Sequence, residues 1–490
     1  MHQADILLGK LQQVRQFEPD NIAAFCTIGR ELVQLGYAQE SRKCYRAAVD
    51  MLRRAARAGN VDRALRCEYL IYEAFVKAVE DGQHYYRCFS DWKDELAAMG
   101  RRFRDPSMLA SNVTNGGGVG LILINGNVLG HSEVLLKLLE ARPRTDSNHR
   151  EPRIYVLDEF EPRFLERCRA IGMEVVFVLK EMAPSPSAAM AARFTWLRER
   201  LARDRVRACV WVGAPTMVAF AFSMRIAPVQ ILWALRFHPV TGPYIDGYIT
   251  YGARHERERI IGKQAWRVCP VPLAIDATPP DAGAVAELRR RLPQGFLMGT
   301  LARPEKIDSK PFLNSVVRIL EANPQARYLW TGKEEHAGIA GFFRSAGVAD
   351  RCHFVGWVDT RLYAAALDLF LESYPFGTGI VPYQALGAGV PLLSYFSEMT
   401  IFGVNFWHEY PDGKPGSLER HPILCARTPD EYVQLANKLI ADPAFRSEVA
   451  SRGKRFFEEE INSLPYYSRR FFDTIAEIAA NIPAQRKQTS

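Results

Sequence analysis

Apolar segments that alternate with helical segments constrain the fold of this chain more than any other feature. VGLILIN begins at Val119, and PRIYVLD, EVVFVLK, ACVWVG and GYITYG follow at intervals filled by helical patterns. These segments are apolar at consecutive positions, which is typical of strands covered on both faces, and such strands occur in parallel sheets. A second series comprises FLMGTL, ARYLWTG, CHFVGW, LDLFLES and VPLLSY. The sequence therefore predicts two doubly wound, Rossmann-like α/β domains in tandem.

The remaining segments suggest how 490 residues divide, since a chain of this length exceeds a single core. Residues 1–110 lack strand patterns and predict a helical N-terminal domain. Leu35-Gly36-Tyr37, followed by Tyr45, resembles one tetratricopeptide-type hairpin, and a plain helical cap is the alternative. The stretch at 274–295 is rich in Pro, Ala and Arg and suggests a connector. We expect a first Rossmann-like domain at 111–275, a second at 276–465, and a C-terminal helix and tail at 466–490.

Composition narrows the functional classes. The nine cysteines form no CxxC pair, which argues against structural zinc and suits a reducing compartment. The start lacks the order of a signal peptide, and Val210–Leu235, the most apolar region, is interrupted by Gly213, Pro215 and Arg225. We therefore expect a cytoplasmic protein. The net charge of +8 is spread along the chain, which suits an anionic substrate or peripheral membrane association, and no basic-aromatic module predicts nucleic-acid binding.

A glycine-spaced turn joins a strand to a helix in ESYPFGTGIVPYQALGAGVPLLSY, which begins at Glu372. Gly377 and Gly379 allow backbone to approach a ligand closely, and Thr378 supplies a hydroxyl. Free amides of a helix expected to start near Ile380 would add an anion site. The alternative is a tight strand–helix turn without a ligand.

A second turn that suits phosphate follows the first strand of the same domain. GTLARPEKIDSK places Arg303 and Lys306 at the carboxyl edge of the predicted sheet. A lysine there can neutralise a diphosphate, including the charge that develops as a nucleotide leaves. The alternative is a solvated loop lysine, the usual state of this residue. Two such turns at one sheet edge favour a diphosphate site.

These residues carry a family resemblance. The stretch from KID to NPQARYLW resembles the O-linked N-acetylglucosamine transferases and the related bacterial glycosyltransferases that modify adhesin proteins in the cytoplasm. PFGTGIVPYQALGAGVPLLS resembles the phenylalanine–glycine turn of the latter group, and PVQILWALRFHPVTGPYIDGYITY is similar to their segment before the interdomain linker. The resemblance covers roughly Val119–Ile440. It implies the GT-B architecture, with two Rossmann-like domains facing a cleft.

The resemblance also implies roles for individual residues. Lys306 matches the lysine that binds the donor diphosphate, Thr378 and Gly379 match the phosphate-binding turn, and Gly356–Val358 lie where the base is held. The donor-binding set is Arg303, Lys306, Gly356, Trp357, Val358, Phe376, Gly377, Thr378, Gly379 and Ile380.

This chain departs from the family pattern near the nucleotide. The turn is shorter, and Pro382 stands where the family usually has an aspartate for the ribose. His353 lies at the start of its strand, so Trp357 or Tyr363 is better placed to pack on a base. Gln384 falls near the place where retaining relatives often keep a carboxylate, which favours an inverting mechanism.

Two histidines of the first domain are candidates for proton transfer. His131 follows a glycine turn after the first strand, and His238 follows the strand-like QILWALRF. Either could act as a general base or orient the acceptor, because histidine titrates near neutral pH, and the alternative is a structural histidine. Glu133, Asp246 and Arg236 are weaker candidates.

The pattern predicts no metal site, because no Asp-x-Asp follows a strand and Lys306 with a helix start can supply the same electrostatic stabilisation. The predicted function is a metal-independent, inverting glycosyltransferase that moves a hexose, glucose or N-acetylglucosamine, from a UDP-sugar to an acceptor. A protein acceptor is favoured, since helical repeats can hold an extended chain. The alternatives are a transferase of lipopolysaccharide or exopolysaccharide synthesis, a non-catalytic GT-B partner protein, and a nucleotide-sugar epimerase.

Overall fold

The computed structural model divides into two compact units. Unit 1 comprises Met1–Thr250, Glu258–Val268 and Ser468–Ser490, and unit 2 comprises Tyr251–Arg257 and Cys269–Tyr467. The structure describes residues 2–35, 37–76, 89–105, 117–128, 130–142, 151–182, 189–235, 240–252, 256–261, 263–272, 278–379, 381–395 and 423–488.

Unit 1 begins with a helical region in which small and apolar residues recur at helical spacing and are buried. Asn60 caps one of its helices, because its Oδ1 accepts the backbone N–H of Arg63 at 3.1 Å. The elements are α1 His2–Phe17, α2 Ile22–Gln34, α3 Ala38–Arg57, α4 Val61–Ile71, the π-helix η1 Tyr72–Val76, the 3-10 turn η2 Phe89–Asp91 and α6 Lys93–Arg101.

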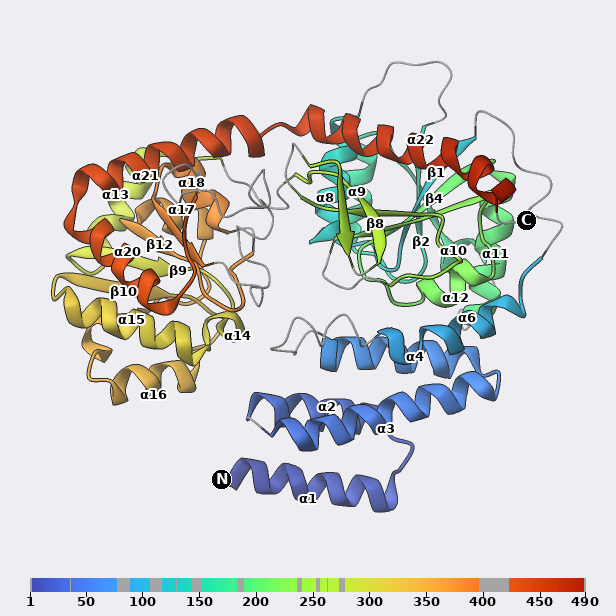
Figure 1. Ribbon diagram of the computed structural model, residues 1–490, viewed down its shortest axis with the longest axis horizontal. Coiled ribbons are helices and arrows are strands. Elements are labelled where there is room, and N and C mark those ends of the chain that lie inside the picture. The colour runs from blue at the N-terminus through green and yellow to red at the C-terminus, as the bar shows by residue number, and fades with distance from the viewer. Residues whose placement is uncertain are drawn as a thin grey trace. The chain divides into compact units, whose positions relative to one another are not determined.

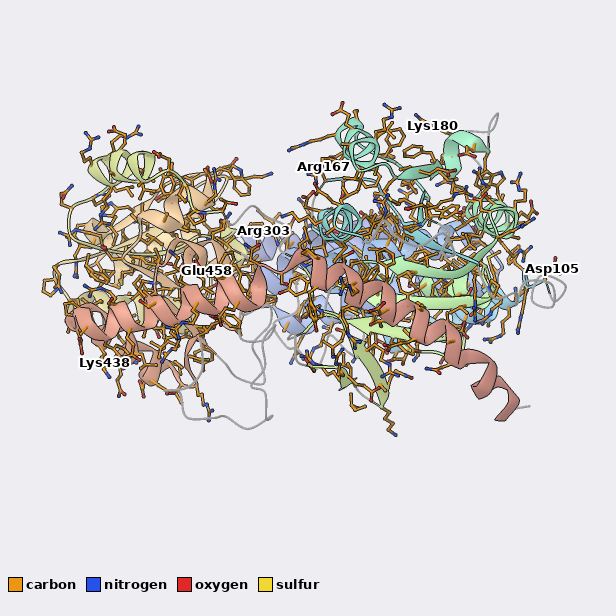
Figure 2. All side chains as sticks on the ribbon, turned by 90° about the horizontal axis from the view of Figure 1, so that it is seen from above. Asp105, Arg167, Lys180, Arg303, Lys438 and Glu458 are labelled. Atoms are coloured by element: carbon orange, nitrogen blue, oxygen red, sulfur yellow. The ribbon has the colours of Figure 1, made fainter. Side chains whose placement is uncertain are left out.

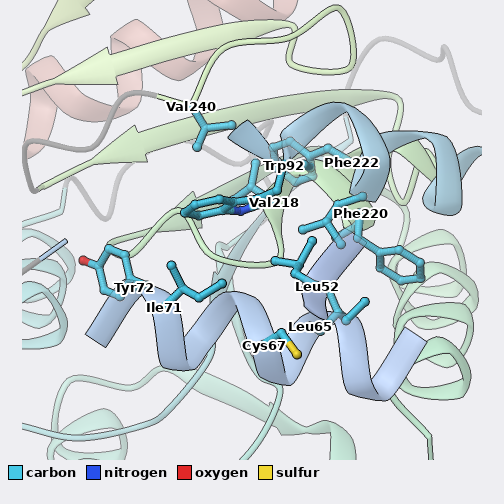
Figure 3. Packing of buried hydrophobic residues seen from close by; sticks show 14 of the residues in the cluster. Leu52, Leu65, Cys67, Ile71, Tyr72, Trp92, Val218, Phe220, Phe222 and Val240 are labelled. Atoms are coloured by element: carbon cyan, nitrogen blue, oxygen red, sulfur yellow. The ribbon is translucent and has the colours of Figure 1, made fainter. Parts of the chain in front are cut away.

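The helical region packs directly against helix α12 (Val218–Ser223). A β-carbon added to Gly100 of α6 would lie 2.2 Å from the carbonyl oxygen of Phe220, so only a glycine permits this approach. Figure 3 shows Trp92 among α4 side chains and Val218. The helical region and the α/β domain that follows it belong to one compact unit, because their apolar faces bury each other.

The sheet of unit 1 is mostly parallel, with the order β3-β2-β1-β4-β5-β6-β8-β7. Figure 1 labels β1, β2, β4 and β8 of this sheet. Only β7 runs antiparallel to its neighbour β8. The strands are β1 Gly118–Leu123, β2 Arg153–Val156, β3 Glu174–Phe177, β4 Val206–Val212, β5 Val229–Ala234, β6 Gly247–Thr250, β7 Glu258–Ile261 and β8 Gln264–Val268. Besides α12, the helices are α8 His131–Glu140, α9 Pro162–Ala170, α10 Val178–Glu181 and α11 Met190–Arg203.

Unit 2 contains a parallel sheet with the order β11-β10-β9-β12-β13-β14. The strands are β9 Phe296–Thr300, β10 Ala326–Trp330, β11 Cys352–Phe354, β12 Leu369–Leu371, β13 Leu392–Tyr395 and β14 Leu424–Ala426. The helices are α13 Ala282–Arg291, α14 Pro304–Ile307, α15 Lys310–Ala322, α16 Ala337–Ser345, α17 Thr360–Ala366, α18 Pro382–Ala388, α20 Pro429–Ala441 and α21 Pro443–Phe456, with the short turns η3 Ala349–Arg351 and η4 Phe457–Ile461.

Both sheets contain strands that are buried along their whole length, which explains why the strands are parallel and covered by helices. Every residue of β5 and of β12 is buried, so helices must cover both faces, and parallel strands joined by helices meet that requirement. In each sheet the first strand lies between the second and the fourth, the doubly wound order. The predicted doubly wound α/β fold is confirmed.

Two further segments pack into these units. The stretch at 274–295 is not merely a connector, because it contains α13, whose Leu288 is buried in the core of unit 2. The expected C-terminal helix is α22 (Leu464–Gln488), which belongs to unit 1 from Ser468 onward. The ring of Phe471 packs 4.4 Å from that of Trp233 in β5, and the Ser468 hydroxyl donates to the Leu138 carbonyl at 2.7 Å.

Candidate functional site

The most constrained site in unit 2 lies where the sheet order reverses. Strand β9 pairs with β10 on one side and with β12 on the other, so the loops after β9 and β12 leave adjacent positions on one sheet edge. Ligands of doubly wound folds bind at the carboxyl ends of the strands beside such a reversal. The loop after β9 leads to Lys306, and the loop after β12 is the PFGTG turn.

The structure brings Lys306 and Gly379 together. A β-carbon added to Gly379 would lie 3.1 Å from the Nζ atom of Lys306, so the ammonium group rests against the backbone of the turn. Gly379 has φ +83°, a left-handed conformation that favours glycine. Any larger residue at 379 would strain the turn and press on the lysine.

Burial governs the ionisation of Lys306. Its side chain is half-buried by surface area, but loss of solvent around the ammonium, together with the neighbouring charge of Arg303, lowers the pKa to about 8. The carboxylate of Glu372 acts in the opposite direction and raises this pKa. A desolvated ammonium favours an anionic ligand, because the ligand offsets part of the cost of removing the charge from water.

Glu372 is the residue at this edge that sequence reasoning did not assign. It follows β12 directly and is 1% exposed. The hydroxyl of Ser394 donates to its Oε2, and its backbone carbonyl accepts the Tyr432 hydroxyl at 2.9 Å. A carboxylate placed immediately after an apolar strand was the signal in the sequence. Its effect on Lys306 could not be inferred without the strand order.

The turn itself is well ordered by short contacts. The Ser373 hydroxyl donates to the Phe376 carbonyl at 2.7 Å, and Gly377 is buried. Thr378 is 4% exposed, and its Oγ1 has no hydrogen-bond partner among the described residues. A buried hydroxyl without a partner is costly, so Thr378 is suited to receive a ligand oxygen.

The helix after the turn starts close to the predicted position. α18 begins at Pro382, and Ile380 lies outside the described residues. Proline at the first helical position has no N–H, and the Gln384 N–H donates to the Val381 carbonyl at 2.9 Å, so the first turn of this seven-residue helix offers few free amides. Lys306 and Thr378 therefore matter more for an anion than the helix start does.

Arg303 lies at the rim of the same edge (Figure 2). It immediately precedes α14, its side chain is 63% exposed, and it pairs with Glu305 at 3.4 Å. An exposed arginine can reach a ligand by changing rotamer, at a small cost since surface ion pairs are weak.

The predicted base-binding residues follow β11, two strand positions from β9. Trp357 is 67% exposed, and the Nζ atom of Lys333 lies 5.9 Å from its ring centroid. Gly356, with φ +78°, accepts the Gly332 N–H at 3.2 Å, and Val358 is half-buried. Strands lie about 4.8 Å apart, so a nucleotide can extend from Lys306 to Trp357 along the edge of one sheet.

The other candidates for the base are less accessible. His353 lies within β11, and burial, followed by the charge of Arg327, lowers its pKa. Tyr363 is half-buried in α17. Gln384, which concerns the retaining or inverting mechanism and not the base, is 5% exposed in α18. Trp357 is therefore the aromatic side chain best presented for stacking among these residues.

Unit 1 has an equivalent edge between β1 and β4, and His131 lies there. It is the first residue of α8, and a β-carbon added to Gly213, after β4, would lie 2.7 Å from its ring atoms. Buried Oδ1 of Asn127 and Oγ1 of Thr216, from the loops after the same two strands, have no hydrogen-bond partner among the described residues. His131 is half-buried, and these two polar atoms lie in loops that leave the same edge of the sheet.

The other candidates of unit 1 either have structural partners or lie outside the described residues. Asp246 forms a 2.6 Å ion pair with buried Arg225 and accepts the Gln230 N–H at 2.8 Å. Glu133 pairs with Arg167 at 3.4 Å. His238 and Arg236 fall outside the described residues.

Two further searches concern metals and membranes. Within the described ranges, no group of three or more His, Cys, Asp or Glu side chains is arranged to hold a metal ion. Likewise, the described helices include none that is both long and apolar enough to cross a bilayer.

Known proteins resemble this chain in their structures. No protein-family model and no curated protein matches this sequence. A mutant of the Thermobaculum terrenum O-GlcNAc transferase is similar in structure, with a TM-score of 0.59 and 16% identity over 99% of this chain and 98% of that chain. Anabaena HepE in complex with UDP-glucose has a TM-score of 0.51 and 14% identity over 74% of this chain and 100% of that chain. A glycosyltransferase from Rickettsia africae has a TM-score of 0.52 and 10% identity over 75% of this chain and 100% of that chain.

Identities this low relate folds and not activities. The likeness to the O-GlcNAc transferase extends through the helical region as well as both sheets, since it spans 99% of the chain. With two doubly wound parallel sheets and these structural neighbours, the chain has the GT-B fold of glycosyltransferases.

Proposed function

We propose that this protein is an inverting, metal-independent glycosyltransferase that moves a hexose, glucose or N-acetylglucosamine, from a UDP-sugar to an acceptor. The observation that carries the proposal is the contact of the Lys306 ammonium with the Gly379 turn, at the reversal of strand order in unit 2. A diphosphate there would gain a cation held in a partly desolvated position, and the hydroxyl of Thr378, which has no hydrogen-bond partner among the described residues. Such preorganised charge stabilises a leaving nucleotide without a metal ion.

Two observations support a uridine nucleotide as donor. A solved neighbour, HepE, is in complex with UDP-glucose and shares the fold with a TM-score of 0.51. In this chain, exposed Trp357 offers a stacking surface on the same sheet edge as Lys306. Gln384, which is neutral, gives no carboxylate for a retaining mechanism at that position.

A protein side chain is the favoured acceptor. The structural likeness to an O-GlcNAc transferase includes the helical region, and a stack of helices can hold an extended peptide. His131, at the β1–β4 edge of unit 1, is the candidate for orienting the acceptor or taking its proton.

The first experiment is a donor screen in EDTA with wild type, Lys306→Ala and the matched control Lys310→Ala. Lys310 is an exposed lysine four residues away, at the start of α15. UDP-, GDP-, TDP- and ADP-sugars are compared by nucleotide release and thermal shift. We expect slow release from a UDP-sugar that falls about 100-fold or more in Lys306→Ala only, because the leaving-group charge loses its partner.

The other outcomes are equally informative. If none of the donors binds or releases its nucleotide, a non-catalytic partner protein is the better hypothesis. Pro382, which stands where the family usually has an aspartate for the ribose, would then account for the loss of donor binding. Near-normal release in Lys306→Ala would refute the role of this lysine. Once a donor is known, transfer to peptides tested against transfer to lipopolysaccharide cores decides between the protein and the glycan acceptor.

A further inference from the structure

A buried carboxylate lies in the apolar interior between the helical region and the sheet of unit 1. Glu68 is 1% exposed, on the face of α4 that also buries Leu65 and Ile71. Its Oε2 accepts the backbone N–H of Met217 at 2.7 Å, and its Oε1 accepts the Nε1–H of Trp92 at 3.2 Å. A carboxylate in such surroundings is costly without hydrogen bonds, and each oxygen of Glu68 has one.

Met217 is the N-cap residue of α12, immediately before Val218. It has φ +67°, a left-handed conformation that is unfavourable for residues other than glycine. A strained residue of this kind persists where its surroundings hold it, and Glu68 binds its amide directly. The carboxylate therefore fixes the place where the loop after β4 ends and the helix begins.

The other end of this loop, Gly213–Met217, is held by the sheet. The Gly213 N–H donates to the Trp233 carbonyl at 3.2 Å, and the Trp211 Nε1–H donates to the Ala214 carbonyl at 2.9 Å. The imidazole of His131 packs on Gly213. One short loop thus has Glu68 at its end and His131 at its start.

We propose that Glu68 is a positioning residue: through the Gly213–Met217 loop it sets the place of His131, so that the helical region is part of the acceptor side of the site. The assignment of this edge to the acceptor rests on the proposed function, whereas the link from Glu68 to His131 does not. Burial raises the pKa of Glu68 to about 7, because removing the charged carboxylate from water is unfavourable.

Two substitutions test the link through the chemistry of its donors. Both partners of Glu68 are N–H groups, and glutamine has only one acceptor oxygen, so Glu68→Gln must point its own N–H₂ at a donor. Trp92→Phe removes one of these donors but also shortens a fully buried side chain, so the double variant is compared with Trp92→Phe itself. In the double variant Glu68→Gln/Trp92→Phe the amide oxygen is free to face Met217, which restores that hydrogen bond.

Hydrogen exchange of peptides spanning 213–222 and the NMR titration of His131 are the readouts, on the full chain without donor. In Glu68→Gln we expect exchange about tenfold faster, as for loss of one hydrogen bond to a charged group, and a shift of the His131 titration larger than for the other histidines. The double variant should return both readouts toward those of Trp92→Phe. Calorimetric UDP-glucose binding should stay unchanged in all three, since the donor residues lie in unit 2.

The inference is overturned if Glu68→Gln leaves both readouts at wild-type values, or if the double variant is no closer to Trp92→Phe than Glu68→Gln is. Should Glu68→Gln not fold, Glu68→Asp, which keeps two acceptor oxygens on a shorter side chain, must show the same two changes in smaller measure. None of these readouts requires turnover. A donor screen without activity therefore refutes the proposed function and leaves this link intact, and active enzyme with an unaffected loop does the reverse.

Discussion

At the scale of single residues, the properties of unit 2 depend on the surroundings of one ammonium group. Lys306 is partly desolvated and rests on the Gly379 backbone. The charge of Arg303 lowers its pKa, and the charge of Glu372 raises it. The buried Glu372 lessens the cost of charging the lysine. The result is a cation whose protonation changes within an experimentally accessible pH range.

We predict a pH dependence of donor binding from this pKa. The pKa of Lys306 is lowered to about 8, so the free protein loses the ammonium as pH rises through 8. UDP-glucose affinity, measured by calorimetry from pH 7 to 10, should then fall about tenfold per pH unit above 8. Lys306→Arg stays charged over this range and should give a flat profile. Parallel profiles for the two proteins would exclude Lys306 as the titrating group.

At the scale of elements, the helical region is attached through close helix–helix contact. Gly100 brings the backbone of α6 against the Phe220 carbonyl of α12, and the Lys93 ammonium donates to the Thr241 carbonyl at 3.0 Å. The Arg198 guanidinium of α11 donates to the Phe103 carbonyl at 2.7 Å. These contacts make the helices a structural part of unit 1.

Gly100→Ala should therefore destabilise unit 1. The added methyl group would meet a backbone oxygen at 2.2 Å, and overpacking of this kind typically costs about 1–3 kcal/mol. The matched control is Gly9→Ala in α1, where nothing lies within 4 Å of the added carbon and alanine is the better helix former. Thermal denaturation should show a lower melting temperature for Gly100→Ala only. Equal melting of the two variants would contradict the close packing.

At the scale of the whole molecule, the chain passes between its units more than once. Residues Tyr251–Arg257 belong to unit 2, Glu258–Val268 to unit 1, and the chain returns to unit 1 from Ser468 onward. The returning part of α22 lies on the sheet of unit 1: Phe471 packs on Trp233, and the Arg207 guanidinium donates to the Ala479 carbonyl at 2.9 Å. The C-terminal helix α22 therefore contributes to the core of unit 1, the unit that contains the N-terminal residues.

We predict that Phe471→Ala weakens unit 1 and spares unit 2. Phe471 is fully buried, and truncating a buried phenylalanine typically costs about 3–5 kcal/mol. Hydrogen exchange should accelerate in β1, β4 and β5 and stay unchanged in β9, β10 and β12. Asp473→Ala, an exposed change on the same helix, serves as control. Faster exchange in both sheets would show that the effect is not confined to unit 1.

Much of the fold could be predicted because burial on both faces leaves a local signal. β1, β4, β5, β9 and β10 are nearly continuous apolar runs, and the sequence alone identifies them. β14 has only three residues and β7 exposes alternate positions, so neither shows such a run. The predicted tetratricopeptide-type hairpin and the roles of the donor residues stay predictions.

The sequence by itself determined the strands, the helices and the glycine turn, because these depend on the periodicity and backbone freedom of neighbouring residues. Only the tertiary structure decided which of them meet. Lys306 reaches Gly379 because β9 pairs with β12, a strand that is not its neighbour in sequence. Glu68 reaches Met217 across 149 residues because the helical region buries its apolar face on α12. Contacts over such separations depend on how whole elements pack, and no local pattern specifies them.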